Sequence, residues 1–453
     1  MTIIIFVLLV ISEAALLIAS LARGCGKLQW QRDRALSRGI EFLLLLGFIL
    51  LPFTYMKWRF TGALILLGIL LLIAGILWLN VRKKADSAVK KSRVIMSAVL
   101  SVVMIGFALF PAFVFKNYNG LETSGAYEVR ECSAILIDEN REDPFENDGS
   151  LREVPVHFYY PDAEGSFPLV IFSHGAFGYY QSNYSTYAEL VSNGYVVVSL
   201  DHPHHAFFTK NSKGKTVIVD TQFISDAVAV SNGEKSMEEE YALFREWMAL
   251  RTADVNFVLD TIEAAKDSGA AGASWYMENE DEIRTVLGMI DTEHIGVMGH
   301  SMGGATAVSA GRTRDDVDAV IVLDGTMLDE ITGFENGTVS YNETPYPVPV
   351  LEFGKEADYS EDAQAQDAQA QDAYQFAYVN RYVMEHAKEG KTVVFENVGH
   401  MDFTDLPLFS PMLSSMLGSE KIDHEAFMKQ VNGLVLDWFD CYLKGTPDMQ
   451  AAY

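Results

Sequence analysis

A Gly-x-Ser-x-Gly pattern at residues 299–303 (GHSMG) is where residue types and spacing first suggest chemistry. An apolar run at residues 294–298 leads into it, and a stretch of small residues at 304–311 follows. A strand, a sharp turn and a helix of this kind hold a serine Oγ above the edge of a sheet, with glycines where side chains would collide. The pattern predicts that Ser301 is a nucleophile; a Gly-rich turn with a structural role only is the alternative.

A serine hydroxyl needs a base to remove its proton and a carboxylate to orient that base. In hydrolases with this turn, the acid and then the histidine follow the serine along the chain. His386, His400 and His424 lie far enough downstream. His386 and His424 fall in helical patterns, whereas His400 comes directly after the apolar run at residues 391–398 and Gly399. His400 is therefore the predicted base.

Two carboxylates stand at strand ends where the orienting acid is expected. Asp324 ends the run AVIVLD at residues 319–324, and Asp358 lies just beyond the run VPVLEFG at residues 348–354. Each could instead be an ordinary helix N-cap or turn aspartate. The residue pattern alone leaves both positions open.

Stabilising an oxyanion requires backbone N–H donors aimed at it. The N–H of Met302, next to the predicted nucleophile, is one candidate. The loop at residues 173–176 (SHGA), which follows the apolar run at 167–172, is the second, and Ala176 is the residue we expect to donate. His174 is expected to shape this loop without transferring a proton.

No metal or cofactor is expected. The segment DHPHH at residues 201–205 could hold a metal ion, but its ligands are too close together to reach one ion easily, and it is predicted to line the substrate pocket. The three cysteines lack zinc or redox spacing. Cys132 and Cys441 would pair only in an oxidising compartment, which leaves a bridge and two thiols both open.

Short apolar runs alternate with helical patterns from residue 128 onward, which predicts an α/β fold, a mostly parallel sheet covered by helices on both faces. The first two runs, at 131–138 and 154–161, are expected to form an antiparallel edge. Residues 207–240 show no clear strand and suggest a lid over the site. The repeat DAQAQDAQAQD at 362–372 is expected to be a solvated surface extension.

The first quarter of the chain differs in character from the rest. Four apolar runs, at residues 3–21, 40–56, 60–79 and 94–115, are each near the roughly 20 residues that cross a bilayer. The sequence thus predicts a four-helix transmembrane anchor at 1–115, a linker at 116–127 and a catalytic domain at 128–453. Glu13 and Glu41 within this part are expected to be interfacial carboxylates.

Charge sets the expected orientation and excludes some partners. Lys and Arg gather in the first and third loops, so those loops should be cytoplasmic and the catalytic domain extracytoplasmic. Up to Lys116 there are 14 Lys and Arg against 4 Asp and Glu; beyond it there are 20 against 57. This acidic excess disfavours nucleic acid as a partner and favours neutral or zwitterionic substrates.

The segments that carry these residues resemble the type II platelet-activating factor acetylhydrolases and lipoprotein-associated phospholipase A2, which are α/β-hydrolases. The similarity spans roughly residues 127–443. Its specific parts are FSHG at 172–175, GHSMGGAT at 299–306, LDGTM at 323–327 and VGHMDFTDL at 398–406.

This resemblance implies an α/β-hydrolase fold with Ser301, Asp324 and His400 as the catalytic set, and keeps Asp358 as the reserve acid. It also implies calcium-independent hydrolysis of short or oxidised acyl chains from phospholipids. Met302 stands where that family has phenylalanine, and Gly325-Thr326 where it has Ala-Trp. The membrane anchor and the acidic repeat are not features of those enzymes, so the resemblance bears more on catalysis than on substrate.

A cutinase-like or polyester hydrolase is the second interpretation, because it shares the SHG-like loop and the GHSMGG motif and would use Asp358 as its acid. A membrane sensor that keeps a hydrolase scaffold without catalysis is the third. The leading hypothesis is a serine carboxylester hydrolase acting on a small ester or phospholipid through an acyl-enzyme.

Overall fold

The computed structural model describes residues 2–24, 26–82, 87–268, 274–335, 338–356 and 378–446. The chain forms two compact units. The first comprises Met1–Gly120 and Pro407–Met416, and the second comprises Leu121–Leu406 and Leu417–Tyr453. Residues 407–416, which were predicted to belong to the catalytic domain, are thus part of the first unit.

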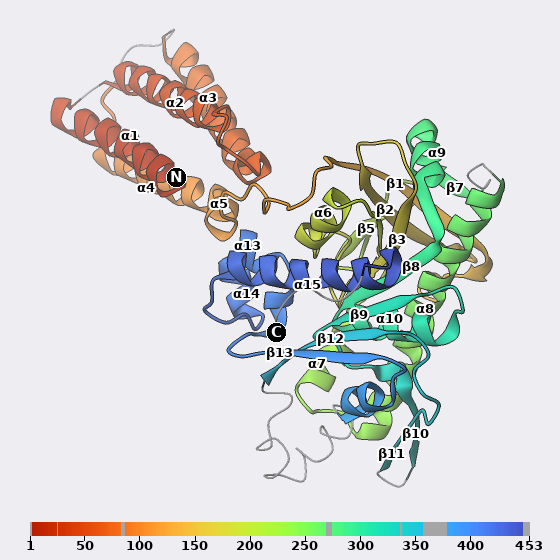
Figure 1. Ribbon diagram of the computed structural model, residues 1–453. Helices are drawn as coiled ribbons and strands as arrows, with labels where there is room; N and C mark the ends of the chain where they lie inside the picture. The colour runs from red at the N-terminus through yellow and green to blue at the C-terminus, as the bar shows by residue number, and fades with distance from the viewer. Residues whose placement is uncertain are drawn as a thin grey trace. The chain divides into compact units, whose positions relative to one another are not determined.

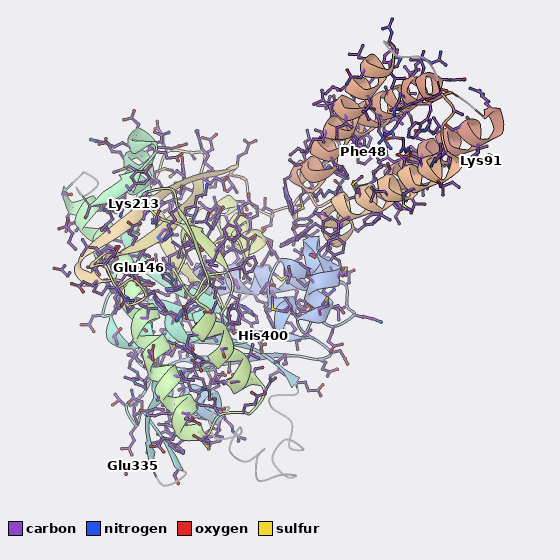
Figure 2. The ribbon with its side chains drawn as sticks, turned by 180° about the vertical axis from the view of Figure 1, so that it is seen from behind. Phe48, Lys91, Glu146, Lys213, Glu335 and His400 are labelled. Carbon is purple, nitrogen blue, oxygen red and sulfur yellow. The ribbon has the colours of Figure 1, made fainter. Side chains whose placement is uncertain are left out.

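The first unit is a helical bundle. Its helices are α1 (Thr2–Arg23), α2 (Lys27–Ile49), α3 (Thr61–Val81), α4 (Lys91–Ala108), α5 (Phe110–Val114) and α14 (Pro411–Met416), with the short 3-10 helix η1 (Lys57–Phe60) before α3. Among the described residues, three helical stretches are long and apolar enough to cross a membrane: Thr2–Arg23, Lys57–Val81 and Lys91–Ala108. Figure 2 labels Phe48 on α2 and Lys91 at the start of α4.

Helix α2 differs from the second predicted span. An apolar helix was expected at residues 40–56, but α2 begins at Lys27 and ends at Ile49, so its first half is polar. Arg, Lys and Gln in that half are good helix formers, and the helix buries one face against α1 and α3. The charged first loop is therefore largely helical.

A buried ionic cluster joins three helices of the bundle. Arg38 on α2 pairs with Glu13 on α1 and with Glu41 one turn further along α2, at 2.6 Å for the latter. Its Nη2 also donates to the Ser101 hydroxyl on α4 at 2.6 Å. Glu13 and Glu41 are thus buried partners of one guanidinium, which corrects the expectation of two interfacial carboxylates.

The two ends of the bundle have different connections. At one end the first and third loops lie together, since Gly26 forms a β-bridge with Ala88. At the other end, Arg59 donates to the Phe115 carbonyl at 2.8 Å and to Asn117 at 2.9 Å. The basic loops and the exit toward the second unit therefore lie at opposite ends.

The second unit is built on a nine-stranded sheet in the order β13-β12-β9-β8-β3-β4-β2-β1-β7. All pairings from β4 to β13 are parallel, and β2, β1 and β7 add an antiparallel edge. The strands are β1 (Val129–Glu142), β2 (Leu151–Pro161), β3 (Phe167–Ser173), β4 (Val196–Leu200), β7 (Trp275–Met277), β8 (Ile290–His300), β9 (Ala319–Leu323), β12 (Val350–Lys355) and β13 (Gly390–Phe395). This confirms the predicted α/β fold and its antiparallel edge.

Helices cover both faces of this sheet (Figure 1). On one face, α6 (Tyr184–Ser192) packs against α15 (His424–Lys444); on the other, α8 (Met237–Ser268) packs against α10 (Met302–Thr313). β3, β4 and β9 are buried along their whole length, as near-continuous Val, Ile and Leu runs require of central parallel strands. The hydrophobic core lies between the sheet and these helices.

Smaller elements decorate the sheet. They are the hairpins β5 (Phe208–Lys210)–β6 (Thr216–Ile218) and β10 (Ile331–Glu335)–β11 (Thr338–Tyr341), the helices α7 (Thr221–Ser231) and α9 (Glu280–Met289), and the 3-10 turns η2 (Leu328–Glu330) and η4 (His400–Phe403). The short helix α13 (Leu406–Phe409) lies almost entirely in the segment 407–416 of the first unit. The segment 207–240, in which no strand was expected, thus contains the β5–β6 hairpin. Strands of three residues are too short to leave a clear alternating pattern.

Candidate active site

Ser301 occupies a strained turn between β8 and α10. Its backbone angles are φ 56° and ψ −125°, a conformation rare for a side chain with a Cβ. The Ser301 N–H donates to the Leu323 carbonyl on β9 at 2.9 Å, which holds the turn against the neighbouring strand. A Cβ at Gly303 would lie 1.9 Å from the Ser173 carbonyl oxygen, so only glycine fits there. The close-packed turn is the one that the glycine spacing predicts.

His400 and Asp324 meet at the carboxyl ends of the strands. His400 Nδ1 lies 2.5 Å from Asp324 Oδ2, and Lys355 Nζ lies 3.3 Å from the same oxygen. Burial raises the pKa of Asp324, but the hydrogen bond and charge of His400 and the charge of Lys355 outweigh it, so the net pKa is lowered. An ionised Asp324 therefore accepts the Nδ1–H of His400 and leaves Nε2 as the other ring nitrogen.

Hydrogen bonds from neighbouring segments hold the loop that carries His400. His400 follows β13 and opens η4. Asp402 accepts from the N–H groups of Gly399 at 2.7 Å and Glu420 at 3.0 Å. His300, the residue before Ser301, donates from Nε2 to the His400 carbonyl at 3.0 Å, and their rings lie 4.6 Å apart. The imidazole is thus placed beside the nucleophile turn.

The loop at residues 173–176 lies against the same turn. A Cβ at Gly175 would come within 3.2 Å of Ser301 Cβ and 3.0 Å of His300 Nδ1, so the backbone here approaches the serine closely. Ala176 follows Gly175 in this loop. Met302 is the first residue of α10, and the first four N–H groups of a helix have no acceptor within it. Both predicted donors therefore belong to segments that border Ser301.

Other sequence-based expectations have different outcomes. Asp358 and the repeat at 362–372 lie outside the described residues.

In the segment DHPHH at residues 201–205, His202 is fully buried in a polar network. His205 borders a cavity of about 430 Å³, which Trp247 and Phe145 also line. Burial lowers the pKa of His202 to about 4. His202 thus forms part of the core, which corrects the prediction that it lines the substrate pocket.

Cys132 and Cys441 are both present as thiols. Burial raises the pKa of the Cys132 thiol to about 12, which makes it unreactive at neutral pH.

Two site-forming residues carry no sequence signal of their own. Lys355 ends the strand β12 and reaches Asp324. Arg251, in the long helix α8, is fully buried and donates to the carbonyl oxygens of His174 and Gly175. Arginine in the middle of a 32-residue helix looks like a surface residue, and only the fold brings it under the loop at 173–176.

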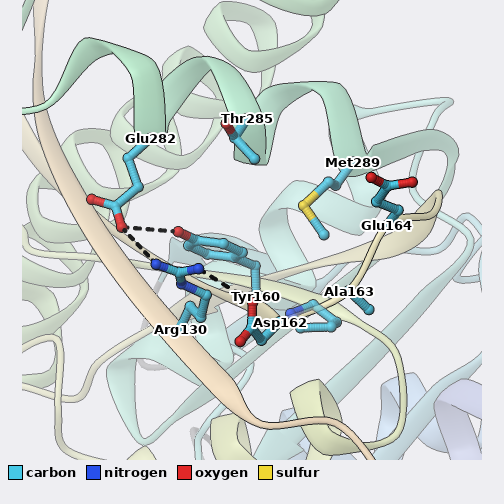
Figure 3. A pocket seen from close by; sticks show the side chains of 9 residues that line it. Arg130, Tyr160, Asp162, Ala163, Glu164, Glu282, Thr285 and Met289 are labelled. Atoms are coloured by element: carbon cyan, nitrogen blue, oxygen red, sulfur yellow. Dashed lines mark hydrogen bonds and ion pairs between the residues drawn. The ribbon is translucent and has the colours of Figure 1, made fainter.

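A separate cleft of about 310 Å³ lies at the antiparallel edge of the sheet, between residues of β1, β2 and α9 (Figure 3). Because β2 runs antiparallel to β4, Tyr160 and Pro161 lie toward the amino end of β4, away from the carboxyl ends that carry Ser301 and His400. In the cleft, Arg130 lies 3.2 Å from Asp162 and 3.8 Å from Glu282. Two carboxylates thus already surround its one cationic side chain.

The strand order, with a serine on a strained turn after β8 and a carboxylate–imidazole pair after β9 and β13, defines an α/β-hydrolase. The family model described as platelet-activating factor acetylhydrolase, isoform II, matches residues 155–448, and the chain belongs to this family.

Individual relatives agree with that membership. A platelet-activating factor acetylhydrolase of Cavia porcellus is 24% identical over 317 residues, covering 65% of this chain and 62% of the relative. One of Bos taurus is 27% identical over 192 residues, covering 40% and 39%. The similarity thus spans less than two thirds of the length of either relative.

A solved structure, a ferulic acid esterase from Streptomyces cinnamoneus, superposes with a TM-score of 0.51 at 20% identity. It covers 73% of this chain and 95% of that one. At this identity the superposition supports the fold alone.

Proposed function

We propose that this protein is a membrane-anchored serine carboxylester hydrolase. The observation that carries the proposal is the hydrogen bond between His400 and Asp324, placed at the strand ends beside Ser301 on its strained turn. Family membership supports an ester as substrate.

In the proposed mechanism, His400 Nε2 removes the proton of Ser301 Oγ as that oxygen attacks the ester carbonyl carbon. Asp324 keeps the Nδ1 proton in place and stabilises the imidazolium that forms. The N–H groups of Ala176 and Met302 stabilise the oxyanion. His400 then protonates the leaving alkoxide, and water, activated by the same imidazole, releases the acid from the acyl-enzyme.

For substrate, we propose short-chain or modified phospholipids or other small esters. The named relatives are platelet-activating factor acetylhydrolases, and the chain's net charge of −27 disfavours strongly anionic substrates at long range. The apolar helices would keep the enzyme close to a lipid substrate, with the catalytic unit on the extracytoplasmic side. The structural neighbour's name suggests hydroxycinnamate esters as a comparison set.

Ser301→Ala is the direct test. The variant is expected to lose hydrolysis of p-nitrophenyl esters and covalent labelling by a fluorophosphonate while keeping its thermal unfolding midpoint. Retained labelling at another serine would refute the assignment.

A panel of short-chain phospholipids, p-nitrophenyl esters of increasing length and hydroxycinnamate esters then decides the substrate class. An intact wild-type protein that neither labels nor hydrolyses any ester would instead support the non-catalytic membrane sensor.

A further inference from the structure

The carbonyl oxygen of Gly175, in the loop at 173–176, accepts three hydrogen bonds. The donors are His174 Nδ1 at 2.6 Å, the Gly178 N–H at 3.1 Å and Arg251 Nη2 at 3.3 Å. The same peptide group carries the N–H of Ala176, and the C=O and N–H of a planar trans peptide point in opposite directions. Whatever holds the Gly175 carbonyl therefore also aims the N–H of Ala176.

The tautomer of His174 follows from its two neighbours. The backbone N–H of His202 donates to His174 Nε2 at 3.2 Å, so Nε2 carries no proton and Nδ1 is the donor to Gly175. Burial, together with the charge of Arg251, places the pKa of His174 well below its ordinary value. The imidazole is thus a fixed neutral donor at neutral pH.

Arg251 is the charged member of the group. Its Nη1 donates to the His174 carbonyl at 2.6 Å and its Nη2 to the Gly175 carbonyl at 3.3 Å, so the fork spans two successive peptide groups of the loop. Its Nε donates to His205 Nδ1 at 3.3 Å. Burial lowers the pKa of Arg251 to about 9, which leaves it charged at neutral pH. A charged donor on a carbonyl oxygen draws electron density from the peptide and strengthens its N–H as a donor.

A second, inaccessible chain of bonds anchors this arrangement. Ser173 Oγ lies 2.9 Å from His202 Nε2, and His202 Nδ1 lies 3.0 Å from Asp254 Oδ2. The order of atoms is that of a catalytic triad, but all three residues are fully buried and no substrate can reach them. Asp254 stands on α8 three residues after Arg251, so the chain ties this helix to the end of β3.

We infer that Arg251 is a positioning residue for ester hydrolysis: through the Gly175 carbonyl it aims and polarises the N–H of Ala176 toward the oxyanion. The inference rests on the proposed function and adds to it a role for a side chain that does not touch substrate. Losing one oxyanion donor costs roughly 10²–10³ in kcat. A donor that is weakened and misdirected should cost less, about 10- to 100-fold in kcat with KM within about threefold.

The experiment uses the full chain in detergent micelles. Arg251→Met removes the charge and the fork, Arg251→Gln keeps a neutral donor and Arg251→Lys keeps the charge. Arg312→Met is the matched control, because Arg312 also bonds a backbone carbonyl, that of Pro345, and a carboxylate, but lies at the far end of α10 from Ser301. For each we would measure the unfolding midpoint, kcat and KM on a p-nitrophenyl ester, and Ki for a trifluoromethyl ketone.

The trifluoromethyl ketone is the decisive probe, since its adduct with a serine places an oxyanion in the hole. If Arg251 positions the donor, Arg251→Met lowers kcat and raises Ki by about the same factor, and Arg251→Lys keeps more activity than Arg251→Gln. Arg312→Met leaves the ratio of Ki to KM at the wild-type value. A purely structural role would instead lower the unfolding midpoint without changing that ratio.

The inference fails if folded Arg251→Met keeps kcat and Ki within about threefold of wild type, or if KM and Ki rise together. If Arg251→Met does not fold, the comparison of Lys with Gln decides, and equal activity in these two would refute polarisation by charge. A wild-type protein that neither labels with fluorophosphonate nor hydrolyses esters would refute the proposed function. An active enzyme that is insensitive at Arg251 refutes the inference alone.

Discussion

Asp324 is the residue whose surroundings constrain the proposed chemistry most. It has a positive φ of 47°, its N–H donates to the Phe353 carbonyl at 2.9 Å, and its carboxylate is shared between His400 and Lys355. The backbone is thus held in an uncommon conformation that points the carboxylate at the imidazole. Strain of this kind at a strand end is typical of functional positions.

We therefore predict that Asp324→Asn lowers kcat by about 10⁴, because the amide can no longer fix the Nδ1 proton of His400 or stabilise the imidazolium. KM should change little. Asp358→Asn is the matched control and should cost less than about tenfold. Steady-state kinetics on one soluble ester, with unfolding midpoints compared first, measure both. A large loss at Asp358 with a small one at Asp324 would favour the cutinase-like interpretation.

A second carboxyl group makes stability depend on pH. Burial of Asp201 raises its pKa from 3.8 to about 7, although hydrogen bonds from Thr209 and the Tyr180 N–H oppose the rise. His157, whose Nε2 lies 4.0 Å from this carboxylate, has its own pKa lowered to about 3 by burial and is neutral there. Between pH 4 and 7 the folded state therefore binds more protons at Asp201 than the unfolded state does.

This raised pKa means that the Asp201 contribution to stability is largest below about pH 4 and is lost as the pH rises toward 7. Asp201→Asn should remove that part of the slope. Unfolding midpoints of the two proteins, measured at several values between pH 4 and 7.5, give the comparison. The acidic surface contributes the same background to both proteins. Parallel curves would show that Asp201 titrates alike in the folded and unfolded states.

At the scale of elements, the helical bundle of the first unit contains an ionic cluster that no single helix could form. Arg38 on α2 is fully buried; it forms ion pairs with Glu13 on α1 and Glu41 on α2 and donates a hydrogen bond to Ser101 on α4. Removing one member of a buried ionic group leaves its partners charged and uncompensated.

Arg38→Met is accordingly expected to destabilise the bundle by about 3–5 kcal/mol. The triple variant Glu13→Gln, Arg38→Met, Glu41→Gln should recover most of that loss, because neutral side chains can stay buried without a counter-charge. Thermal unfolding in detergent, followed by circular dichroism, measures both. If the triple variant is no more stable than Arg38→Met, repulsion between uncompensated carboxylates is not the cause.

At the scale of the whole molecule, the distribution of charge predicts how the chain sits in a membrane. The first and third loops, both rich in Lys and Arg, meet at one end of the bundle through the Gly26–Ala88 bridge, and the exit at Phe115 lies at the other. We propose on this basis that both loops lie on the cytoplasmic side and the catalytic unit on the extracytoplasmic side.

A single cysteine at Gly120, in a background without native cysteines, should react with a membrane-impermeant maleimide in intact cells. One at Ala88 should react only after permeabilisation. Equal labelling of both sites after permeabilisation is the control for accessibility. The reverse pattern in intact cells would place the hydrolase in the cytoplasm.

Local pattern was enough to predict the α/β fold, the antiparallel edge and the turn at Ser301. These features depend on neighbouring residues: β-branched runs that are buried on both faces, and glycines where a Cβ would strike backbone, as at Gly303. The apolar helices α1, α3 and α4 could also be predicted from the sequence, because the ability to cross a bilayer depends on length and composition. The same turn predicts that an acid and then a histidine follow the serine along the chain, and the roles of Ser301, Asp324 and His400 stay predictions.

Tertiary structure decided what depends on residues far apart in the chain. It brought Asp324 to His400 across 76 positions, placed Arg251 under a loop 76 residues earlier and joined Glu13 to Arg38 within the bundle. It also packed residues 407–416 with the first unit. Arginine, aspartate and glutamate read as surface residues from sequence, since their burial is affordable only where the fold supplies partners from other elements.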